Sequence, residues 1–197
     1  MEKIVFATHN AHKLAELRRI VGERMLIVGL DDIGCHEDIQ ETADTLQGNA
    51  LQKARWVKEH YGLDCIADDT GLEVAALGGA PGVHSARYCG DEHNSEGNMA
   101  LLLQNMQGRT DRRARFVTEI ALIEGDEPVR FFTGEVRGTI LEAPERGNHG
   151  FGYDPVFRPD CRADGSFATM TPDEKNAVSH RGRAVAALME YLNKKFR

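Results

Sequence analysis

The sequence has 197 residues, a length typical of one folded domain with a substantial apolar core. Hydrophobic residues make up 41% of it and charged residues 28%, which argues against a disordered or fibrous chain. The net charge of −7 disfavours nucleic acid as a partner, whereas a small anion needs only a few cations gathered in one place.

Neither membrane insertion nor disulfide bonding is expected. The longest apolar runs are far too short to span a bilayer, and the start MEKIVFATHN contains no apolar signal-peptide core, so we expect a cytoplasmic protein that binds no membrane. The four cysteines, Cys35, Cys65, Cys89 and Cys161, form no CxxC pair. We therefore expect reduced, mostly buried thiols rather than zinc ligands or a redox pair.

The first half of the chain alternates strand and helix patterns. A β-branched and aromatic run at residues 3–8 predicts a strand, and the apolar spacing of residues 14–21 predicts a helix after it. Residues 50–57 repeat the helical spacing, and residues 64–68 (DCIAD) read as a strand that ends in two aspartates. Such alternation is typical of an α/β protein.

The second half adds an antiparallel element. Glycine and proline in residues 77–83 (LGGAPGV) predict a loop, and residues 96–106 resume a helical pattern. Residues 115–123 and 129–140 are strand-like runs separated by EGDEP, which predicts a hairpin.

The last helix has the clearest start signal. Thr171 and Glu174 form a Thr-x-x-Glu capping box, with Pro172 at the first helical position. Apolar residues from 178 to 192 give this helix one buried face. The elements together predict one α/β domain with a mixed, twisted sheet covered by helices, without repeats or linkers.

Residues 8–13 (THNAHK) lie between the first predicted strand and the helix that follows it. The N–H groups and the dipole of a helix start favour an anion, Asn10 can cap the helix, and Lys13 adds a full charge. We interpret the segment as a phosphate-binding loop. The alternative is an ordinary capped helix with an exposed lysine, since the GxxxxGK[ST] pattern of a P-loop is absent.

Residues 67–72 (ADDTGL) place two carboxylates side by side. Neighbouring side chains on a strand point to opposite faces, so Asp68 and Asp69 share one site only if the backbone turns there, as Thr70 and Gly71 suggest. Glu41 could add another oxygen ligand for magnesium. Taken singly, the aspartates could equally be a solvated turn and Glu41 a surface residue.

Two later segments could bind a base. In residues 147–155 (GNHGFGYDP), Phe151 or Tyr153 could stack on a base while Asp154 meets its edge; a tight turn with core aromatics is the alternative. Residues 175–181 (KNAVSHR), expected inside the terminal helix, bring cationic or donor groups within two turns. A solvated charged face is the alternative there.

THNAHK, ADDTGL, GFGYD, and a lysine followed by SHR occur together in the order and at the spacings of one family. From Ile4 to the terminal helix, the chain resembles the non-canonical purine nucleoside-triphosphate pyrophosphatases of the inosine triphosphatase type. The resemblance implies one pyrophosphatase domain over residues 1–197, an active-site cleft between two lobes, and a homodimer. It also implies hydrolysis of ITP, dITP and XTP to the monophosphate and pyrophosphate, which cleanses the nucleotide pool.

The same resemblance implies roles for individual residues. Glu41 and Asp69 would hold Mg²⁺, Asp69 would activate water, and Asp68 would support them. Ser85 and Arg87 would line the cleft. The substrate-binding positions that it implies are Thr8, His9, Asn10, Ala11, His12, Lys13, Lys53, Thr70, Phe151, Gly152, Tyr153, Asp154, Lys175, His180 and Arg181.

Three residues depart from the family pattern. His9 stands where Gly or Ser is frequent and would crowd the phosphate loop, Thr70 replaces a frequent Ser but keeps the hydroxyl, and His84 replaces a usual Tyr. Two alternative functions stay open: a related pyrophosphatase of different base preference, and a non-catalytic nucleotide sensor. The intact carboxylates count against the sensor, because a pure binder needs no base beside a metal.

Overall fold

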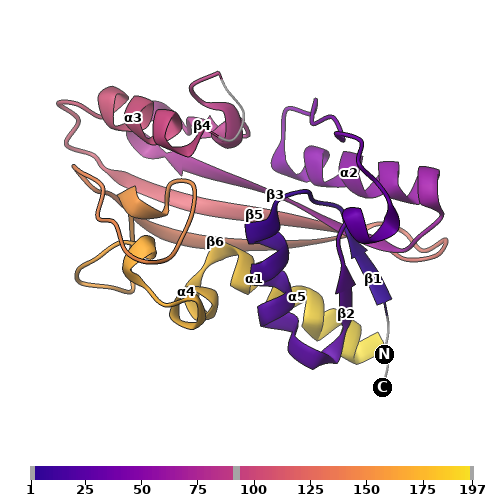
Figure 1. The fold of residues 1–197 in the computed structure, drawn as a ribbon. Helices are drawn as coiled ribbons and strands as arrows, with labels where there is room; N and C mark the ends of the chain where they lie inside the picture. The colour runs from indigo at the N-terminus through magenta and orange to yellow at the C-terminus, as the bar shows by residue number, and fades with distance from the viewer. Residues whose placement is uncertain (1–2, 91–93, 196–197) are drawn as a thin grey trace. The chain divides into compact units, whose positions relative to one another are not determined.

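The computed structural model describes residues 3–90 and 94–195, which form two compact units. Unit 1 comprises Met1–Asp69, Thr118–Gly134 and Arg181–Arg197, and unit 2 comprises Thr70–Val117 and Glu135–His180. Three strands contribute residues to both units: β3 (Cys65–Val74), β5 (Arg113–Ile123) and β6 (Arg130–Ile140) (Figure 1). Single turns of 3-10 helix lie at Gly22–Arg24, Asp31–Ile33, Ala75–Leu77, Ser85–Arg87, Asp154–Val156 and Phe167–Thr169.

Unit 1 is built on strands in the order β2, β1, β3, β5 and β6. β1 (Lys3–Phe6) is parallel both to β2 (Leu26–Val28) and to β3. The helices of this unit are α1 (Ala11–Val21), α2 (Leu46–Tyr61) and nearly all of α5 (His180–Lys195).

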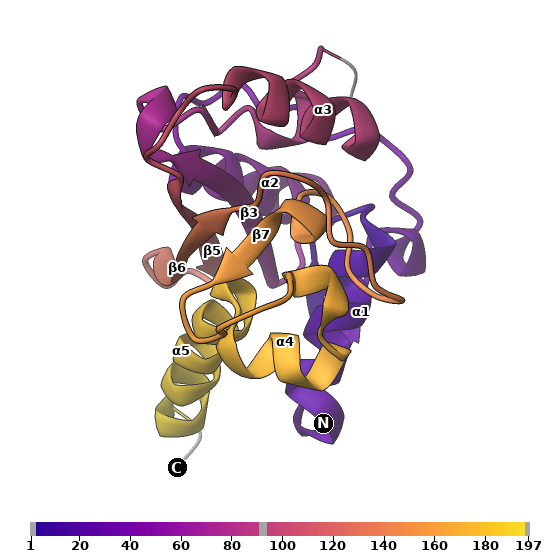
Figure 2. The same cartoon turned by 90° about the vertical axis from the view of Figure 1, so that its left-hand side faces the viewer.

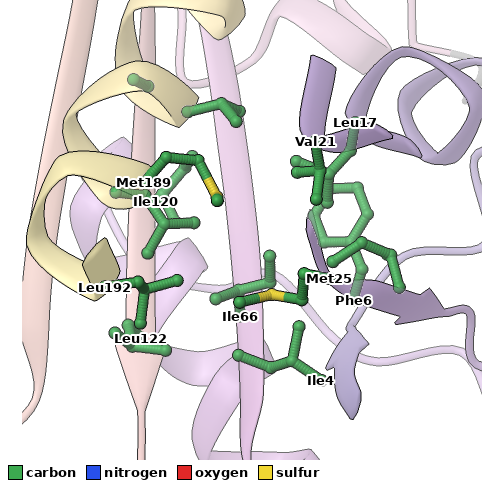
Figure 3. Close-up of a cluster of buried hydrophobic side chains, with 14 residues drawn as sticks. Ile4, Phe6, Leu17, Val21, Met25, Ile66, Ile120, Leu122, Met189 and Leu192 are labelled. Atoms are coloured by element: carbon green, nitrogen blue, oxygen red, sulfur yellow. The ribbon is translucent and has the colours of Figure 1, made fainter. Parts of the chain in front are cut away.

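The two faces of the unit 1 sheet carry separate cores, because successive strand residues point to opposite sides. Ile4, Phe6 and Ile66 pack with apolar residues of α1 and α5 on one face (Figure 3). Val5 and Ala67 pack with residues of α2 on the other. Helices therefore cover both faces of this part of the sheet.

Unit 2 carries strands in the order β3, β5, β6 and β7, with β4 (Pro81–Gly82) also paired to β3. β4 is antiparallel to β3, and β7 (Phe157–Pro159) is antiparallel to β6 (Figure 2). The helices are α3 (Ser95–Asn105) and α4 (Pro172–Val178). The predicted α/β class with a mixed sheet is confirmed.

Most predicted elements are present, with differences in the short ones. The hairpin forms as β5 and β6, and the predicted helices form as α1, α2 and α3. The three-residue strands β2 and β7 were not predicted, because so few residues carry no periodicity. The segment 77–83 is not entirely loop: Pro81 and Gly82 pair with β3 as β4.

The turn predicted at Thr70 and Gly71 was wrong, because β3 continues without a break to Val74. Burial explains the difference: Leu72 and Val74 belong to the core of unit 2, and Leu72 pairs with Gly82 of β4. Core packing and strand pairing therefore outweigh the turn preference of the local sequence.

The prediction of a single terminal helix was also wrong, because the helix is interrupted at Ser179. The capping box that starts α4 is present, but Ser179 has an extended backbone with ψ 160°, and α5 begins at His180. Val178 packs against the core of unit 2, whereas Val185 belongs to a core cluster of unit 1. Two helices, of 7 and 16 residues, therefore bury residues in two separate cores.

Removing the cap of α4 should lower the free energy of unfolding by about 1 kcal/mol, the usual loss for such a cap. The Thr171 hydroxyl accepts a hydrogen bond from the Glu174 N–H at 3.3 Å, and the Thr171 N–H donates to the Glu174 carboxylate at 2.8 Å. Urea unfolding of Thr171→Ala measures the loss. The exposed Thr110, outside the helices, supplies the control Thr110→Ala; equal unfolding midpoints for the two variants would contradict the prediction.

All four cysteines are free thiols, but only Cys35 and Cys65 are buried. Cys89 is partly exposed and Cys161 exposed, so the expectation of mostly buried thiols holds for half of them. Among the described residues, no helix combines the length and the apolar character that a membrane crossing requires.

Candidate active site

The loop between β1 and α1 forms the predicted helix cap. The Asn10 side-chain oxygen accepts hydrogen bonds from the N–H groups of His12 at 3.0 Å and Lys13 at 3.2 Å. The Asn10 N–H donates to the Thr8 hydroxyl at 3.1 Å. Because the cap uses two of the N–H groups at the helix start, an anion bound here would depend more on the charge of Lys13 and on the helix dipole.

The side chain of His9 contacts another loop of unit 1. Its Nε2 lies 2.9 Å from the backbone carbonyl of Glu37, and this hydrogen bond requires the proton on Nε2. The imidazole is thereby tied to the segment that precedes Glu41. The side chain of His9, which stands where the family often has Gly or Ser, is therefore directed toward that segment.

The two aspartates of β3 have different partners. The Asp68 carboxylate accepts hydrogen bonds from Lys13 Nζ at 2.9 Å and from Arg181 Nε at 3.0 Å. Asp69 accepts a hydrogen bond from the Asn49 side chain at 3.0 Å. The two carboxylates therefore have different hydrogen-bond partners, although the charges of Lys13 and Lys53 act on both.

These environments push the two pKa values apart. Burial alone would raise the pKa of Asp68, but the charges of Lys13, Arg181 and Lys53 outweigh it and hold that pKa well below its usual range. Burial raises the pKa of Asp69; the charges of Lys53 and Lys13 lower it and the charge of Glu41 raises it, and the net direction is upward. Asp68 is therefore a fixed anion, while Asp69 has the raised proton affinity that suits a general base.

Glu41 lies beside Lys53, which is buried on α2. The Lys53 ammonium forms an ion pair with the Glu41 carboxylate. Burial alone would lower the pKa of Lys53, but Asp69, Glu41 and Asp68 together raise it. The ammonium is therefore kept charged among carboxylates.

Glu41 and Asp69 are suited to a divalent cation. They are hard oxygen donors close enough for the charge of Glu41 to disfavour ionisation of Asp69, and the Lys53 ammonium lies beside them. Among the residues that the structure describes, no three or more His, Cys, Asp or Glu side chains are grouped to hold a metal. Magnesium commonly binds through one or two carboxylates and takes its other ligands from phosphates and water, so this pair fits such a site.

In unit 2, Asp154 holds a loop and a lysine together. One carboxylate oxygen, Oδ2, accepts from the Phe151 N–H at 2.8 Å and from Lys175 Nζ at 2.7 Å. Gly150 has φ +90°, and a Cβ at this position would lie 2.8 Å from the same oxygen. Glycine is therefore needed both for the backbone conformation and for the close approach.

Phe151 and Tyr153 occupy different environments. The Tyr153 ring is in the core of unit 2, and its hydroxyl donates to the backbone carbonyl of Ser85 at 2.8 Å. Phe151 is half-buried, and Lys175 Nζ lies 4.7 Å from its ring centroid. Of the two aromatics considered for stacking on a base, Phe151 is the one placed outside the core cluster.

Ser85 has a structural contact within unit 2. Its hydroxyl accepts a hydrogen bond from the Leu72 N–H at 2.9 Å and donates to the Gly82 carbonyl at 2.6 Å. These bonds attach the segment after β4 to β3.

His180 and Arg181 are neighbours in the chain but have different surroundings. The His180 ring is buried in unit 2 and stacks on Phe116, with centroids 4.6 Å apart. The Arg181 guanidinium is buried in unit 1, where it binds Asp68 and Glu16. His180 and Arg181 both lie at the start of α5, whereas Lys175 lies on α4, so the three predicted groups do not share one helix.

The predicted residues thus form two sets. Unit 1 contains the predicted phosphate and metal residues, namely residues 8–13, Glu41, Lys53, Asp69 and also Arg181. Unit 2 contains Thr70, residues 151–154, Lys175 and His180. Members of the two sets are adjacent in the sequence at two points: Asp69 precedes Thr70, and His180 precedes Arg181.

Sequence reasoning missed three partners of these residues: Asn49, Glu16 and Phe116. For two of them a signal was present, because Asn49 lies four residues before Lys53 and Glu16 three residues after Lys13, which are same-face spacings on a helix. No local spacing relates Phe116 to His180.

The chain is similar to known proteins along almost its whole length. A model of the Ham1 family matches residues 4–191. A protein of Christiangramia forsetii named dITP/XTP pyrophosphatase is 52% identical over 193 residues, which cover 98% of this chain and 100% of that protein. The dITP/XTP pyrophosphatase of Porphyromonas gingivalis is 55% identical over 193 residues, 98% of each chain.

Solved structures show the same fold. A HAM1 protein from Coxiella burnetii matches with a TM-score of 0.88 and 37% identity, covering 98% of this chain and 100% of that one. The Staphylococcus aureus Ham1 protein matches with a TM-score of 0.87 and 34% identity over the same shares of the two chains.

Proposed function

Because this chain belongs to the Ham1 family, we propose that it hydrolyses non-canonical purine nucleoside triphosphates, namely ITP, dITP and XTP, to the monophosphate and pyrophosphate. The observation that carries the proposal is the setting of Asp69, a buried carboxylate of raised pKa near Glu41, Lys53 and Lys13. Such a hydrolase would remove deaminated purines before they enter nucleic acid.

The proposed cofactor is Mg²⁺, which Glu41 and Asp69 would hold together with the substrate phosphates. When bound, it supplies charge neutralisation at the phosphate oxygens and a template for in-line displacement. The fit of the two carboxylates to a hard cation supports this assignment over a softer metal.

The unit 1 residues would carry out the reaction. Asp69 orients a water molecule and accepts its proton as the water oxygen attacks the α-phosphorus. Lys13 and Lys53 offset the charge that develops on the leaving pyrophosphate, and the start of α1 adds the helix dipole. The bond from the α-phosphorus to the bridging oxygen breaks, and no covalent enzyme intermediate is needed.

The unit 2 residues would bind the nucleoside. Phe151 offers a face for stacking on the purine, and Thr70, Gly152 and His180 are the proposed polar or backbone contacts. Asp154 and Tyr153 support this loop from within the unit.

We extend the proposal to the whole chain as one pyrophosphatase domain, because three strands pass through both units. A cytoplasmic homodimer that binds neither nucleic acid nor membrane is proposed from the family resemblance and the net charge of −7.

A pyrophosphate-release assay over a panel of nucleoside triphosphates, with and without Mg²⁺, tests the function. We expect release from ITP, dITP and XTP only with the metal. Preference for another triphosphate would identify a related pyrophosphatase of different base preference. Tight binding without release would identify a sensor instead.

Lys13→Ala should lower kcat/KM for ITP by about tenfold to a hundredfold, the range that a lost charged hydrogen bond gives. Binding of IMP should change much less, because the Lys13 charge is directed at the part of the substrate that leaves. Steady-state kinetics and product inhibition measure the two effects, with Lys58→Ala as a control on α2. Equal weakening of ITP and IMP would place Lys13 elsewhere.

A further inference from the structure

One buried amide side chain of unit 1 contacts both parts of the proposed metal site. Asn49, on α2, is 0% exposed, and its Nδ2 donates a hydrogen bond to Asp69 Oδ2 at 3.0 Å. Its Oδ1 accepts a hydrogen bond from the Ala43 N–H at 2.9 Å. Ala43 lies two residues after Glu41, so the same amide binds Asp69 directly and also binds the segment that carries Glu41.

The two neighbours decide the orientation of the Asn49 amide. A backbone N–H can only donate and an ionised carboxylate can only accept, so the amide oxygen must face Ala43 and the NH₂ group must face Asp69. Aspartate at this position would place an oxygen against the Asp69 carboxylate, and leucine would satisfy neither neighbour. Asparagine is therefore the side chain of this size that holds both contacts.

The backbone that carries this amide is fixed relative to Asp69. The Asn49 N–H donates to the carbonyl of Thr45, the N-cap residue of α2, at 3.0 Å. The next residue, Ala50, packs in one core cluster with Ala67 of β3, the strand that carries Asp69. The amide therefore projects from a helix that is packed against the strand of its carboxylate partner.

Two side chains of α2 hold the residues that follow Glu41. The Gln52 side chain accepts from the Thr42 N–H at 3.0 Å and donates to the Thr42 hydroxyl at 2.7 Å, and Asn49 binds the residue after Thr42. The contacts of Gln52 are exposed, whereas Asn49 is buried and also binds Asp69. The two side chains therefore share the task of holding the segment but differ in their link to Asp69.

We infer that Asn49 is a positioning residue that couples the Asp69 carboxylate to the segment of Glu41, and so holds the two proposed Mg²⁺ ligands at a fixed spacing. The inference rests on the proposed function, in which both carboxylates bind one cation. Hydrogen bonds orient the carboxylates that bind a metal, and losing such a partner typically costs about tenfold to a hundredfold in metal affinity or activity. Asn49 acts through the two ligands and is not itself one.

The first test replaces Asn49 by Leu, which is similar in size but has no hydrogen-bonding group. The Mg²⁺ concentration that gives half the maximal rate of pyrophosphate release from ITP should rise about tenfold to a hundredfold. The KM for ITP at saturating Mg²⁺ should stay within about threefold, because the residues proposed to bind the nucleotide are unchanged. An unchanged Mg²⁺ requirement would overturn the inference.

Gln52→Leu is the matched control. It releases the same segment from the same helix but leaves Asp69 and its amide partner unchanged. Because water competes for exposed hydrogen bonds, this variant should raise the half-saturating Mg²⁺ concentration by less than about threefold. A shift as large as that of Asn49→Leu would overturn the inference, since holding the segment would then account for the whole effect.

Binding of Mn²⁺ to the nucleotide-free protein, followed by electron paramagnetic resonance, is a readout that needs no turnover. Asn49→Leu should bind Mn²⁺ at least about tenfold more weakly than wild type, whereas Gln52→Leu should stay within about threefold. If Asn49→Leu does not fold, Asn49→Ala removes the same two hydrogen bonds with a residue of high helix propensity and should give the same result.

The Mn²⁺ measurement also separates the inference from the proposed function. If the wild-type protein releases no pyrophosphate from any nucleotide, the proposed function fails, and the Mn²⁺ affinities still decide the role of Asn49. Equal affinities of wild type and Asn49→Leu would overturn the inference. A wild-type protein that binds no Mn²⁺ at millimolar concentration would overturn it too.

Discussion

Replacing Asp69 by Asn should lower kcat for ITP hydrolysis by at least about a hundredfold, the upper part of the range for losing a general base together with a metal ligand. The amide keeps the shape of the carboxylate and can keep a hydrogen bond with Asn49. It can neither accept a proton from water nor neutralise a cation. Steady-state kinetics at saturating Mg²⁺ measure the loss.

Stability provides the control for this variant. Because burial and Glu41 raise the pKa of Asp69, the folded protein binds its proton more tightly than the unfolded chain does. The ionised carboxylate therefore reduces stability as pH rises through the raised pKa. In metal-free buffer at pH 7, thermal unfolding of Asp69→Asn should remain a single cooperative transition, which establishes that the variant is folded even though Lys53 has lost one of its neighbouring charges. A folded variant that hydrolyses ITP at a near wild-type rate would refute the mechanism.

The pH dependence of kcat/KM should also reflect the ionisation of Asp69. As Asp69 must be deprotonated to act, kcat/KM of the wild-type protein should fall as pH drops through a pKa above the ordinary aspartate range. The residual activity of Asp69→Asn should lack this acidic limb. A limb that persists unchanged in the variant would belong to another group.

Hydrolysis of ITP or XTP should be at least about a hundredfold more efficient than hydrolysis of ATP or GTP, the discrimination expected from buried hydrogen-bonding groups. The 6-position of the purine is a carbonyl in inosine and xanthosine but an amino group in adenosine. A buried donor that meets the carbonyl would face another donor in ATP, at a cost of about 1–3 kcal/mol per unsatisfied group. His180 and the backbone of residues 151–154 are the candidate donors in unit 2.

Rejection of GTP needs a second element, since guanine shares the 6-carbonyl. A wall or unmatched donor near the 2-position would penalise the exocyclic amine of guanine and tolerate the 2-oxo group of xanthine. Measuring kcat/KM for the four nucleotides side by side separates the two arguments. Parity of ATP with ITP would remove the donor argument, whereas parity of GTP alone would remove only the argument about the 2-position.

A substitution of Phe151 tests whether its ring stacks on the purine. Phe151→Leu removes the aromatic face without changing any donor, so it should lower kcat/KM for all four nucleotides by similar factors. A selective loss for ITP would instead connect Phe151 with recognition of the 6-position.

The sequence predicted elements whose signals are local. The capping box at Thr171 and the Asn10 cap are both present, because each depends on residues within one helical turn. The alternation of strands and helices also predicted the α/β class correctly. These features are decided by neighbours in the chain.

The errors arose where distant contacts decide the backbone. Gly71 favours a turn, but β3 continues as a strand because Leu72 and Val74 are buried in the core of unit 2. The helix beyond Thr171 was expected to be continuous, yet it breaks at Ser179 so that its two parts bury residues in different cores. No periodicity within the segment carries that information.

The site shows the same division. Asp68 and Asp69 were singled out from ADDTGL, but their separate partners, Arg181 and Asn49, come from elements 113 and 20 residues away. Which aspartate becomes the fixed anion and which the base follows from those partners, and so it could not be predicted from the motif.

The exposure pattern of the thiols has a practical consequence for spectroscopy. Cys161 in unit 2 is the exposed cysteine, and with Cys89→Ser a maleimide dye would be directed to it, since Cys35 and Cys65 are buried. The single tryptophan, Trp56, lies on α2 of unit 1. If the dye absorbs tryptophan emission, Trp56 is the energy-transfer donor in unit 1 and the dye on Cys161 is the acceptor in unit 2. The efficiency of energy transfer would then measure the separation of Trp56 from a dye on Cys161 in solution.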